Sequence, residues 1–348
     1  MDIREWIKND ILLFDGAMGT MLQQKGLKQG ALPELLNLTD PESVIQIHRE
    51  YVLAGADVII TNTFQAHELK LREHGTVEDV VNAGVRCARE AAARESAERF
   101  VALDVGPLGQ LLEPLGTISF ERAYEVFRRQ MVAGEKSGAD LILIETISDL
   151  YEAKAAILAA KENTNLPVFC TMTFQEDGRT FLGCDPITAV ITLQGLGVDA
   201  LGVNCSLGPE LLAPVVETML RYSRLPVMIQ PNTGLPVLRE GQPVYDSLPA
   251  QYAAQIFEMV RRGARIVGGC CGTTPEYIRM IREQLGGMKP ADTAPLRVSA
   301  CTSGNRTVIL DGATTEIGER LNPTGKKELQ AALRAGDAAY LINEAIRQ

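Results

Sequence analysis

Short runs of apolar, largely β-branched residues recur along the chain and alternate with longer stretches in which apolar residues follow the helical period. The short runs predict strands at 11–18, 56–64, 100–107, 140–147, 167–174, 200–206, 226–232 and 264–271. The stretches between them predict helices, for example at 42–53, 121–137, 150–163, 209–222 and 249–262. Strands that alternate with helices in this way are typical of βα units in a parallel sheet.

Glycines at the ends of several predicted helices support these boundaries. Gly55, Gly138, Gly197 and Gly263 each stand just before a predicted strand, where a left-handed glycine commonly ends a helix. Eight βα units in about 280 residues is the size of a TIM (β/α)8 barrel. A doubly wound open sheet is the alternative, but no glycine-rich phosphate loop follows the first strand. The sequence therefore predicts an α/β fold, a TIM barrel with a short C-terminal α/β extension.

Polar residues stand at the carboxyl ends of the predicted strands. They are Asp15, Asn62, Asp104, Glu145, Thr173, Cys205, Asn232 and the adjacent pair Cys270 and Cys271. In a TIM barrel these strand ends form one ring, and active sites lie on that ring. We therefore expect residues that are far apart in the sequence to converge there.

Three of the seven cysteines follow a metal-binding pattern. Cys270 and Cys271 are adjacent and flanked by glycines, and Cys205 follows another strand. Glycine lets the backbone turn so that neighbouring side chains can face one ion, and thiolates select zinc among the common metals. Three protein ligands leave the fourth position of a tetrahedral zinc open, as in catalytic sites. The alternative is that these cysteines are small core residues. That is our interpretation of the remaining four: Cys87, Cys170, Cys184 and Cys301.

Carboxylates near the predicted strand ends suggest how a substrate is held. Glu145 follows an apolar strand and can hold a substrate ammonium group, although a surface carboxylate at a loop start is the alternative. Asp15 can form a turn or cap a helix, while backbone amides freed by Gly16 and Gly19 can bind a carboxylate. Asn62 and Asn204 fit turn positions as well. A thiol substrate bound to the metal would be deprotonated and become a nucleophile at neutral pH.

Charge and composition narrow the range of partners. The 348 residues carry a net charge of −10, which argues against nucleic acid and against an anionic membrane surface. No apolar run approaches the ~20 residues of a membrane-spanning helix, and the charged N-terminus has no signal-peptide core. Seven cysteines, an odd number in a long chain, fit a reducing cytoplasmic compartment better than a disulfide framework.

Several motifs together resemble the homocysteine S-methyltransferase domain, over about residues 10–285. They are Asp15-Gly16-Ala17-Met18-Gly19-Thr20, Thr61-Asn62-Thr63-Phe64, Glu145-Thr146, Gly202-Val203-Asn204-Cys205 and Gly268-Gly269-Cys270-Cys271-Gly272-Thr273. The resemblance implies that Cys205, Cys270 and Cys271 bind zinc, and that Asn232 occupies a position that can cap the zinc when substrate is absent. It also implies that Asp15, Gly16 and Glu145 contact the amino-acid end of homocysteine. We add Asn62 and Asn204 to this candidate substrate site.

A second resemblance lies in the C-terminal part of the chain. Residues 289–306 are linker-like. The motif that follows is similar to the start of the pterin-binding domain of cobalamin-dependent methionine synthase: Glu316-Ile317-Gly318-Glu319-Arg320-Leu321-Asn322-Pro323-Thr324-Gly325-Lys326-Lys327. This resemblance implies that Asn322 lies in a folate site. We expect three parts: a homocysteine-binding barrel at 1–288, a linker at 289–306, and an incomplete N-terminal part of a pterin-binding domain at 307–348.

The expected activity is that of a zinc-dependent homocysteine-activating module, which methylates homocysteine to methionine. The methyl group would come from methylcobalamin, and ultimately from 5-methyltetrahydrofolate, on cobalamin- and folate-binding domains in cis or in trans. The chain itself has no cobalamin-binding Asp-x-His-x-x-Gly motif. A same-fold alternative is a stand-alone methyltransferase that uses S-methylmethionine or betaine. Alternatives of other classes are a non-catalytic zinc-binding scaffold and a metal-free α/β protein with core cysteines.

Overall fold

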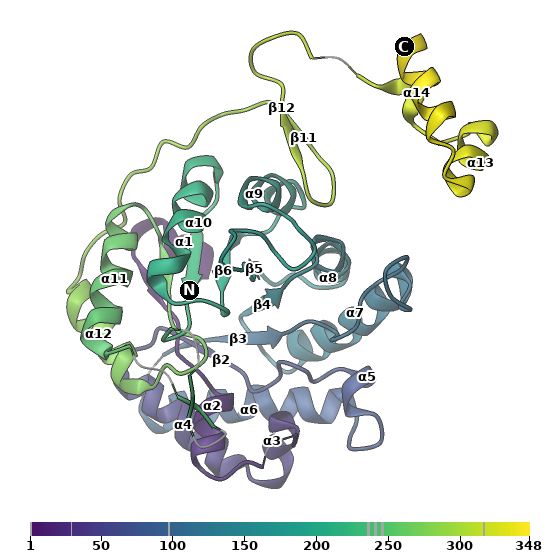
Figure 1. Cartoon of the computed structure of the whole chain (residues 1–348). Helices are drawn as coiled ribbons and strands as arrows, with labels where there is room; N and C mark the ends of the chain where they lie inside the picture. Colours follow the sequence, from purple (N-terminus) through teal and green to yellow (C-terminus); the bar gives the residue numbers. More distant parts are fainter. Residues whose placement is uncertain are drawn as a thin grey trace. The chain divides into compact units, whose positions relative to one another are not determined.

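Parallel strands close into a barrel in the computed structural model, which describes residues 2–28, 30–96, 98–234, 237–239, 242–244, 247–315 and 317–348 (Figure 1). Within these ranges the barrel has eight strands: β1 (Leu12–Leu13), β2 (Val58–Ile60), β3 (Phe100–Val105), β4 (Leu141–Ile147), β5 (Val168–Met172), β6 (Ala200–Asn204), β7 (Val227–Gln230) and β10 (Ile266–Val267). They pair in the order β1-β10-β7-β6-β5-β4-β3-β2, and a parallel bridge between Phe14 and Val58 joins the two ends of that order. The predicted TIM barrel is confirmed.

Helices surround these strands (Figure 1). The helical segments of this part of the chain are α1 (Ile3–Asn9), α2 (Gly19–Gln24), η1 (Pro33–Leu35), α3 (Leu36–Thr39), α4 (Pro41–Ala54), α5 (Glu68–Leu71), α6 (Val77–Arg94), α7 (Phe120–Lys136), α8 (Leu150–Asn163), α9 (Pro186–Gly195), α10 (Pro209–Tyr222), α11 (Pro249–Arg261) and α12 (Pro275–Leu285). A separate antiparallel pair, β8 (Val237–Arg239) and β9 (Gln242–Val244), precedes α11.

The predicted glycine stops are confirmed. Gly55, Gly138, Gly197 and Gly263 have φ values of 99°, 90°, 79° and 119°, so each adopts the left-handed conformation. Most strands, however, end earlier than the sequence predicted. β10, for example, ends at Val267, and the glycines that follow it are already in a loop. The polar residues predicted at the strand ends therefore lie mostly in the loops just beyond, while Asp104 and Glu145 remain inside β3 and β4.

The barrel interior is filled at the end where the strands begin. Phe14, Phe169 and Met228 belong to an inner apolar cluster that also contains Ile3 and Ile7 of α1. The ring of Trp6, on the same helix, packs edge-on against Phe100 at the start of β3, with ring centroids 5.8 Å apart. Helix α1 thus covers one end of the barrel, and the polar loops lie at the other.

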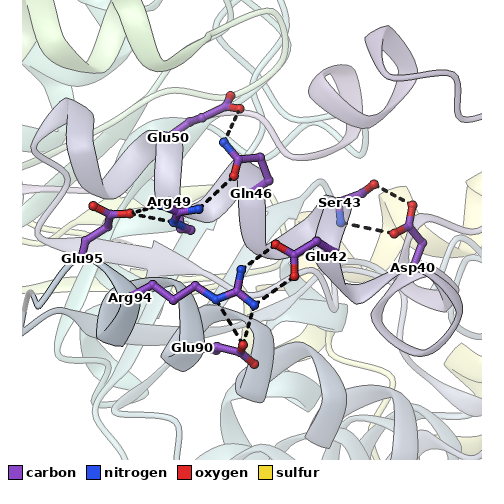
Figure 2. A network of polar contacts seen from close by, with 9 residues as sticks. All are labelled: Asp40, Glu42, Ser43, Gln46, Arg49, Glu50, Glu90, Arg94 and Glu95. Carbon is purple, nitrogen blue, oxygen red and sulfur yellow. Dashed lines mark hydrogen bonds and ion pairs between the residues drawn. The ribbon is translucent and has the colours of Figure 1, made fainter.

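Polar contacts on the outside join neighbouring helices (Figure 2). Arg94 of α6 pairs with Glu42 of α4 at 2.5 Å and with Glu90 of its own helix at 2.6 Å. Arg49 of α4 pairs with Glu95 at 2.6 Å. These groups are partly or largely exposed, and exposed pairs stabilise proteins weakly, so apolar packing is the main contact between the helices.

The chain divides into two compact units. One holds Met1–Arg297 with Thr302–Val308, and the other holds Val298–Cys301 with Ile309–Gln348. The C-terminal elements are β11 (Ala300–Thr302), β12 (Thr307–Ile309), η2 (Glu319–Leu321), α13 (Lys327–Ala335) and α14 (Ala338–Arg347). Leu329 and Ala332 of α13 are buried, whereas Leu333 and Ile342 are 46% and 59% exposed. Among the described residues, no helix is long and apolar enough to cross a membrane.

Candidate metal centre and pocket

The three cysteines singled out in the sequence lie together in the structure. The Sγ atoms of Cys205, Cys270 and Cys271 all lie within 4.8 Å of one another, and those of Cys205 and Cys271 are 3.9 Å apart. In the part of the chain that the structure describes, this is the only group of three or more such ligand atoms. The convergence places one residue after β6 beside two residues after β10.

The other four cysteines were predicted to be small core residues. Cys87, Cys170 and Cys184 are buried, as predicted for core residues. Cys301 is exposed, so that prediction was wrong for it. The reason is that Cys301 belongs to β11, which pairs with β12 in a two-stranded sheet and is not part of the barrel.

Backbone contacts hold the cysteine loops in place. The amide of Cys205 donates to the carbonyl of Gln230 at 2.9 Å, and the amide of Cys270 donates to the carbonyl of Pro231 at 2.9 Å. Both cysteine loops are therefore attached to the end of β7, which lies between β6 and β10 in the sheet. Cys205 and Ser206 have φ values of 60° and 62°, a conformation that is strained for residues other than glycine. Such strain is commonly retained at functional sites.

Glycines make room around the cysteine pair, as the sequence predicted. A Cβ atom on Gly269 would lie 2.3 Å from the Oγ1 of Thr273, and Gly272 has a φ of 84°. The same Thr273 hydroxyl donates to the carbonyl of Cys270 at 2.6 Å. A side chain at position 269 would therefore displace the residue that holds the cysteine loop.

Hydrogen bonds among the three sulfurs shift the pKa values of their thiols. Bonds from Cys270 and Cys271 lower the pKa of the Cys205 thiol to about 3, and a bond from the amide of Asn232 contributes in the same direction. The bond to Cys205 raises the pKa of Cys271 to about 12. These bonds favour the thiolate form of Cys205, and a thiolate attracts a soft cation. Asn232, which the family resemblance implied can cap a zinc ion, lies next to the sulfur of Cys205.

The cysteine cluster forms part of the wall of a cavity of about 400 Å³. Residues 16–20, 33–34, 60–62, 64–65 and 145–146 also line it, together with Asp104 and Gly269. Among the side chains that the structure describes, the wall contains the carboxylates of Glu34, Asp104 and Glu145 but no basic group. Its electrostatics favour a ligand that brings a positive charge of its own.

Glu145 is half-buried in the cavity wall, and burial followed by the charge of Cys205 raises its pKa to about 8. The Nδ2 of Asn204 donates to the Oε2 of Glu145 at 3.3 Å and to the Oγ1 of Thr146 at 2.8 Å. The Oδ1 of Asn204 accepts bonds from the Thr146 amide and the Thr171 hydroxyl, both at 2.8 Å. Asn204 is fully buried and does not belong to the cavity wall, so it orients Glu145 from behind.

Asp15 and Gly16 lie at one end of the pocket. The Oδ2 of Asp15 accepts a bond from the amide of Ile60 at 3.0 Å, and Asp15 lies behind the residues that form the wall. Gly16 is part of the wall, and a Cβ there would lie 2.6 Å from the Oγ1 of Thr273 and 2.9 Å from the hydroxyl of Tyr51. This loop is thus packed directly against the cysteine loop.

The remaining candidate residues fall in two places. Asn62 lines the cavity, and its Nδ2 donates to the carbonyl of Pro33 at 2.8 Å and to the Oδ1 of Asn37 at 3.0 Å. It therefore fixes the segment that contains η1. Asn322 is exposed and follows η2 in the C-terminal unit, where its Oδ1 accepts the amide of Thr324 at 3.0 Å.

Sequence reasoning gave no site role to two carboxylates of the cavity wall. The sequence placed Asp104 on the ring of strand ends, and this position was the feature that could have assigned it to the site. Glu34 belongs to η1, a short segment between α2 and α3 whose sequence has no strand or helix period to mark it. The position of Glu34 in the pocket wall depends on tertiary contacts alone.

The donor set fits a zinc ion. Zn–S bonds of about 2.3 Å in tetrahedral geometry imply roughly 3.8 Å between sulfurs, and the spacing of Cys205 and Cys271 is 3.9 Å. Soft thiolates favour zinc, and three protein ligands are the set found where one coordination position serves a substrate.

Comparisons with known proteins agree on the barrel. The family model described as homocysteine S-methyltransferase matches residues 12–285. Methionine synthase of Mycobacterium tuberculosis is 32% identical over 359 residues, which cover 97% of this chain and 30% of that protein. The chain thus spans under a third of the length of this relative. The solved structures of the homocysteine methyltransferase MmuM from Escherichia coli, in its oxidized and metallated forms, each match with a TM-score of 0.68 and 26% identity. They cover 80% of this chain, and 97% and 98% of their own.

Proposed function

The chain belongs to the homocysteine S-methyltransferase family of methyltransferases, and on that premise we propose that it methylates the sulfur of homocysteine to give methionine. The observation that carries the proposal is the convergence of Cys205, Cys270 and Cys271 on the wall of one cavity. A metal ion held by this cluster would lie where an amino acid of the size of homocysteine can reach it.

The three thiols are the proposed zinc ligands, with Asn232 beside Cys205 as a further candidate. A zinc ion there would offer a coordination position to the substrate sulfur and would lower the pKa of its thiol. The chain's own part is to hold the cysteines together through the contacts at Gln230, Pro231 and Thr273. The substrate sulfur has to lose its proton before the new C–S bond forms.

The amino-acid end of homocysteine is proposed to lie along the rest of the wall. Glu145, held by Asn204, can accept the ammonium group. Gly16 and the residues after it offer backbone amides to the carboxylate. Asp15 supports this loop from behind, and Asn62 shapes the facing wall through Pro33. In this proposed arrangement the substrate lies with its sulfur toward the cysteines.

For the methyl donor we propose methylcobalamin, carried by a cobalamin-binding domain in cis or in trans and recharged ultimately from 5-methyltetrahydrofolate. Support comes from the M. tuberculosis methionine synthase, whose alignment covers 97% of this chain and so extends beyond the barrel. On the same ground we propose 1–288 as the homocysteine barrel, 289–306 as a linker, and 307–348 as the start of a pterin-binding domain with Asn322 in its folate site.

A stand-alone enzyme with another methyl donor is the second candidate, because the MmuM structures match this barrel over nearly their whole length. A donor competition assay distinguishes the two. Methylcobalamin, S-methylmethionine and betaine are offered at equal concentration with homocysteine, and methionine is measured. Methionine formed from methylcobalamin alone supports the first candidate, and methionine formed from either small donor supports the second.

Metal analysis tests the core of the proposal. The protein is purified under reducing conditions, and zinc per chain is measured before and after homocysteine is added. We expect one equivalent of zinc and, by X-ray absorption, one additional sulfur ligand when homocysteine is present. Absence of zinc, or a zinc environment that homocysteine leaves unchanged, would contradict the proposal.

A further inference from the structure

Asp104 and Glu34 are pocket carboxylates for which the proposed function gives no role. Asp104 lies in β3 with 7% of its surface exposed, and Glu34 lies in η1 with 2% exposed. Both line the cavity, yet neither belongs to the cysteine cluster. Buried carboxylates are usually paired or hydrogen-bonded, so their surroundings matter.

The backbone of Asp104 is firmly held while its carboxylate is not. Its amide donates to the Oγ1 of Thr61 at 3.0 Å, and its carbonyl accepts bonds from Thr63 at 2.8 Å and from Gln130 at 3.1 Å. In contrast, the buried Oδ1 of its side chain has no hydrogen-bond partner among the described residues. The fold thus leaves a carboxylate oxygen of Asp104 in the cavity wall without a hydrogen-bond donor among the described residues.

The two carboxylate oxygens of Glu34 also differ in their hydrogen bonds. Its Oε1 accepts a bond from the amide of Gln65 at 2.8 Å, whereas its buried Oε2 has no partner in the described part of the chain. Asn62 anchors the preceding residue, Pro33, through the carbonyl. One oxygen therefore fixes the side chain, and the other remains available to a ligand.

These carboxylates are neighbours of Glu145. Burial, and after it the charges of Glu145, Glu34 and Asp15, raise the pKa of Asp104. Glu145 in turn lies near the sulfur of Cys205. Burial and mutual repulsion therefore disfavour the ionised forms of these neighbouring carboxyls, and a ligand ammonium group among them would offset both effects.

The positions of the Asp104 and Glu34 carboxylates do not suit a metal ion. Their oxygens do not form, with other candidate ligands of the described residues, a group of three within 4.8 Å, as the thiols do. An ammonium group needs no such convergence, because its three N–H donors can reach acceptors on different sides.

We propose that Asp104, with Glu34 beside it, binds the ammonium group of the substrate together with Glu145 and makes the pocket selective for thiols that carry a cation. This inference rests on the proposed function, which directs the substrate sulfur toward the cysteines. A thiol acid without the ammonium group would leave the carboxylates buried and unpaired, and sites built in this way reject such analogues strongly.

The test compares two ligands on three proteins. Homocysteine and 4-sulfanylbutanoate, which is homocysteine without its amino group, are titrated calorimetrically into zinc-supplied full chain, Asp104→Asn and Glu34→Gln. Gln at position 34 retains the acceptor for the Gln65 amide. Glu176→Gln, at an exposed position, is the matched control.

We expect Asp104→Asn to weaken homocysteine binding about 10- to 100-fold and to change binding of the desamino analogue by less than about 3-fold. Glu34→Gln should show the same pattern with a smaller loss, and Glu176→Gln should change neither ligand. Equal losses for both ligands, or an unchanged affinity for homocysteine, would overturn the inference. Should Asp104→Asn fail to fold, the ligand pattern of Glu34→Gln decides.

Thermal unfolding gives a second readout. Removing a buried, unpaired carboxylate from a group of like charges should leave the unfolding midpoint unchanged or raise it. A lower midpoint together with equal losses for both ligands would mark a structural role. Wild-type protein that holds zinc but does not bind homocysteine would overturn the proposed function and this inference together. Wild-type binding with an insensitive Asp104→Asn overturns only the inference.

Discussion

Asn204 Nδ2 donates to Glu145 Oε2 across 3.3 Å, and this bond joins the last residue of β6 to a residue of β4. Asn204 immediately precedes Cys205 in the chain. One short segment therefore supplies a sulfur to the cysteine cluster and orients the carboxylate next to it. The bond thus links the segment that carries Cys205 to the carboxylate proposed to bind the ammonium group.

Replacing Asn204 with Ala should damage both stability and binding. The substitution leaves the buried hydroxyl of Thr171 and the amide of Thr146 without their acceptor and frees Glu145. We expect the free energy of unfolding to fall by about 2–4 kcal/mol. Urea unfolding and homocysteine titration measure the two effects. The exposed Asn165→Ala is the control, and an Asn204→Ala protein with wild-type homocysteine affinity would contradict the orienting role.

Replacing Cys271 with Ala should remove the zinc and the activity while the barrel remains folded. Two cysteines would remain, which is one ligand fewer than the set found in catalytic zinc sites. Metal analysis, methionine formation and circular dichroism are measured together. Cys301→Ala, which changes an exposed cysteine outside the cluster, should behave as wild type. Unfolding of Cys271→Ala at room temperature would instead mark the metal as structural.

Adding a methyl group at position 269 should disturb the metal centre. The Cβ of Gly269→Ala would lie 2.3 Å from the Oγ1 of Thr273, which holds the carbonyl of Cys270. We expect a loss of about 1–3 kcal/mol in stability and weaker zinc binding, measured by competition with a chelator. At Gly195, in α9, a Cβ meets nothing within 4 Å, so Gly195→Ala is the matched control. Unchanged zinc affinity in Gly269→Ala would show that Thr273 has room to move.

The stability of the protein should fall as pH rises, in part because of Glu152. This residue is buried, accepts the amide of Leu108 at 2.7 Å, and has a pKa raised by burial to about 7. Because the folded state prefers the protonated form, its contribution is complete below pH ~4.5 and is lost as pH rises through ~7, up to about 3 kcal/mol. Urea unfolding between pH 4.5 and 8 measures this.

The variant Glu152→Gln keeps the acceptor for Leu108 and removes the titration. Its stability should therefore vary less with pH than that of the wild type over the same window. Other buried carboxylates, such as Asp104 and Glu34, contribute in the same direction in both proteins, so the difference between the two curves isolates Glu152. Parallel curves would mean that Glu152 ionises normally in the fold.

The order of strands and helices could be predicted from the sequence because it rests on local patterns. Helices α8 and α10 have the predicted bounds, and left-handed glycines such as Gly55 end helices where predicted. The cysteine cluster could also be predicted, since glycines flank the adjacent pair and all three cysteines follow strands, whose carboxyl ends form one ring in a barrel. These features depend on periodicity and on the geometry common to all such barrels.

Other features depend on contacts between distant segments, and the sequence had no signal for them. Asp15 lies behind the cavity wall because its carboxylate is bound by Ile60 of β2. Glu34 reaches the pocket because Asn62 holds Pro33. The positive φ of Cys205 follows from the attachment of its loop to Gln230, not from the residue type. Such long-range hydrogen bonds determine the exact position of each side chain.

The placement of β10 between β7 and β1 has a consequence for how the protein is made. Cys205 leaves the ribosome well before Cys270 and Cys271, and the loop of Gln230 and Pro231 that positions both is synthesised between them. Until β10 is inserted, the barrel is an open sheet and Cys205 is a lone thiol. At the proposed zinc site, metal binding would therefore be a late event in biogenesis, after the last barrel strand has been inserted.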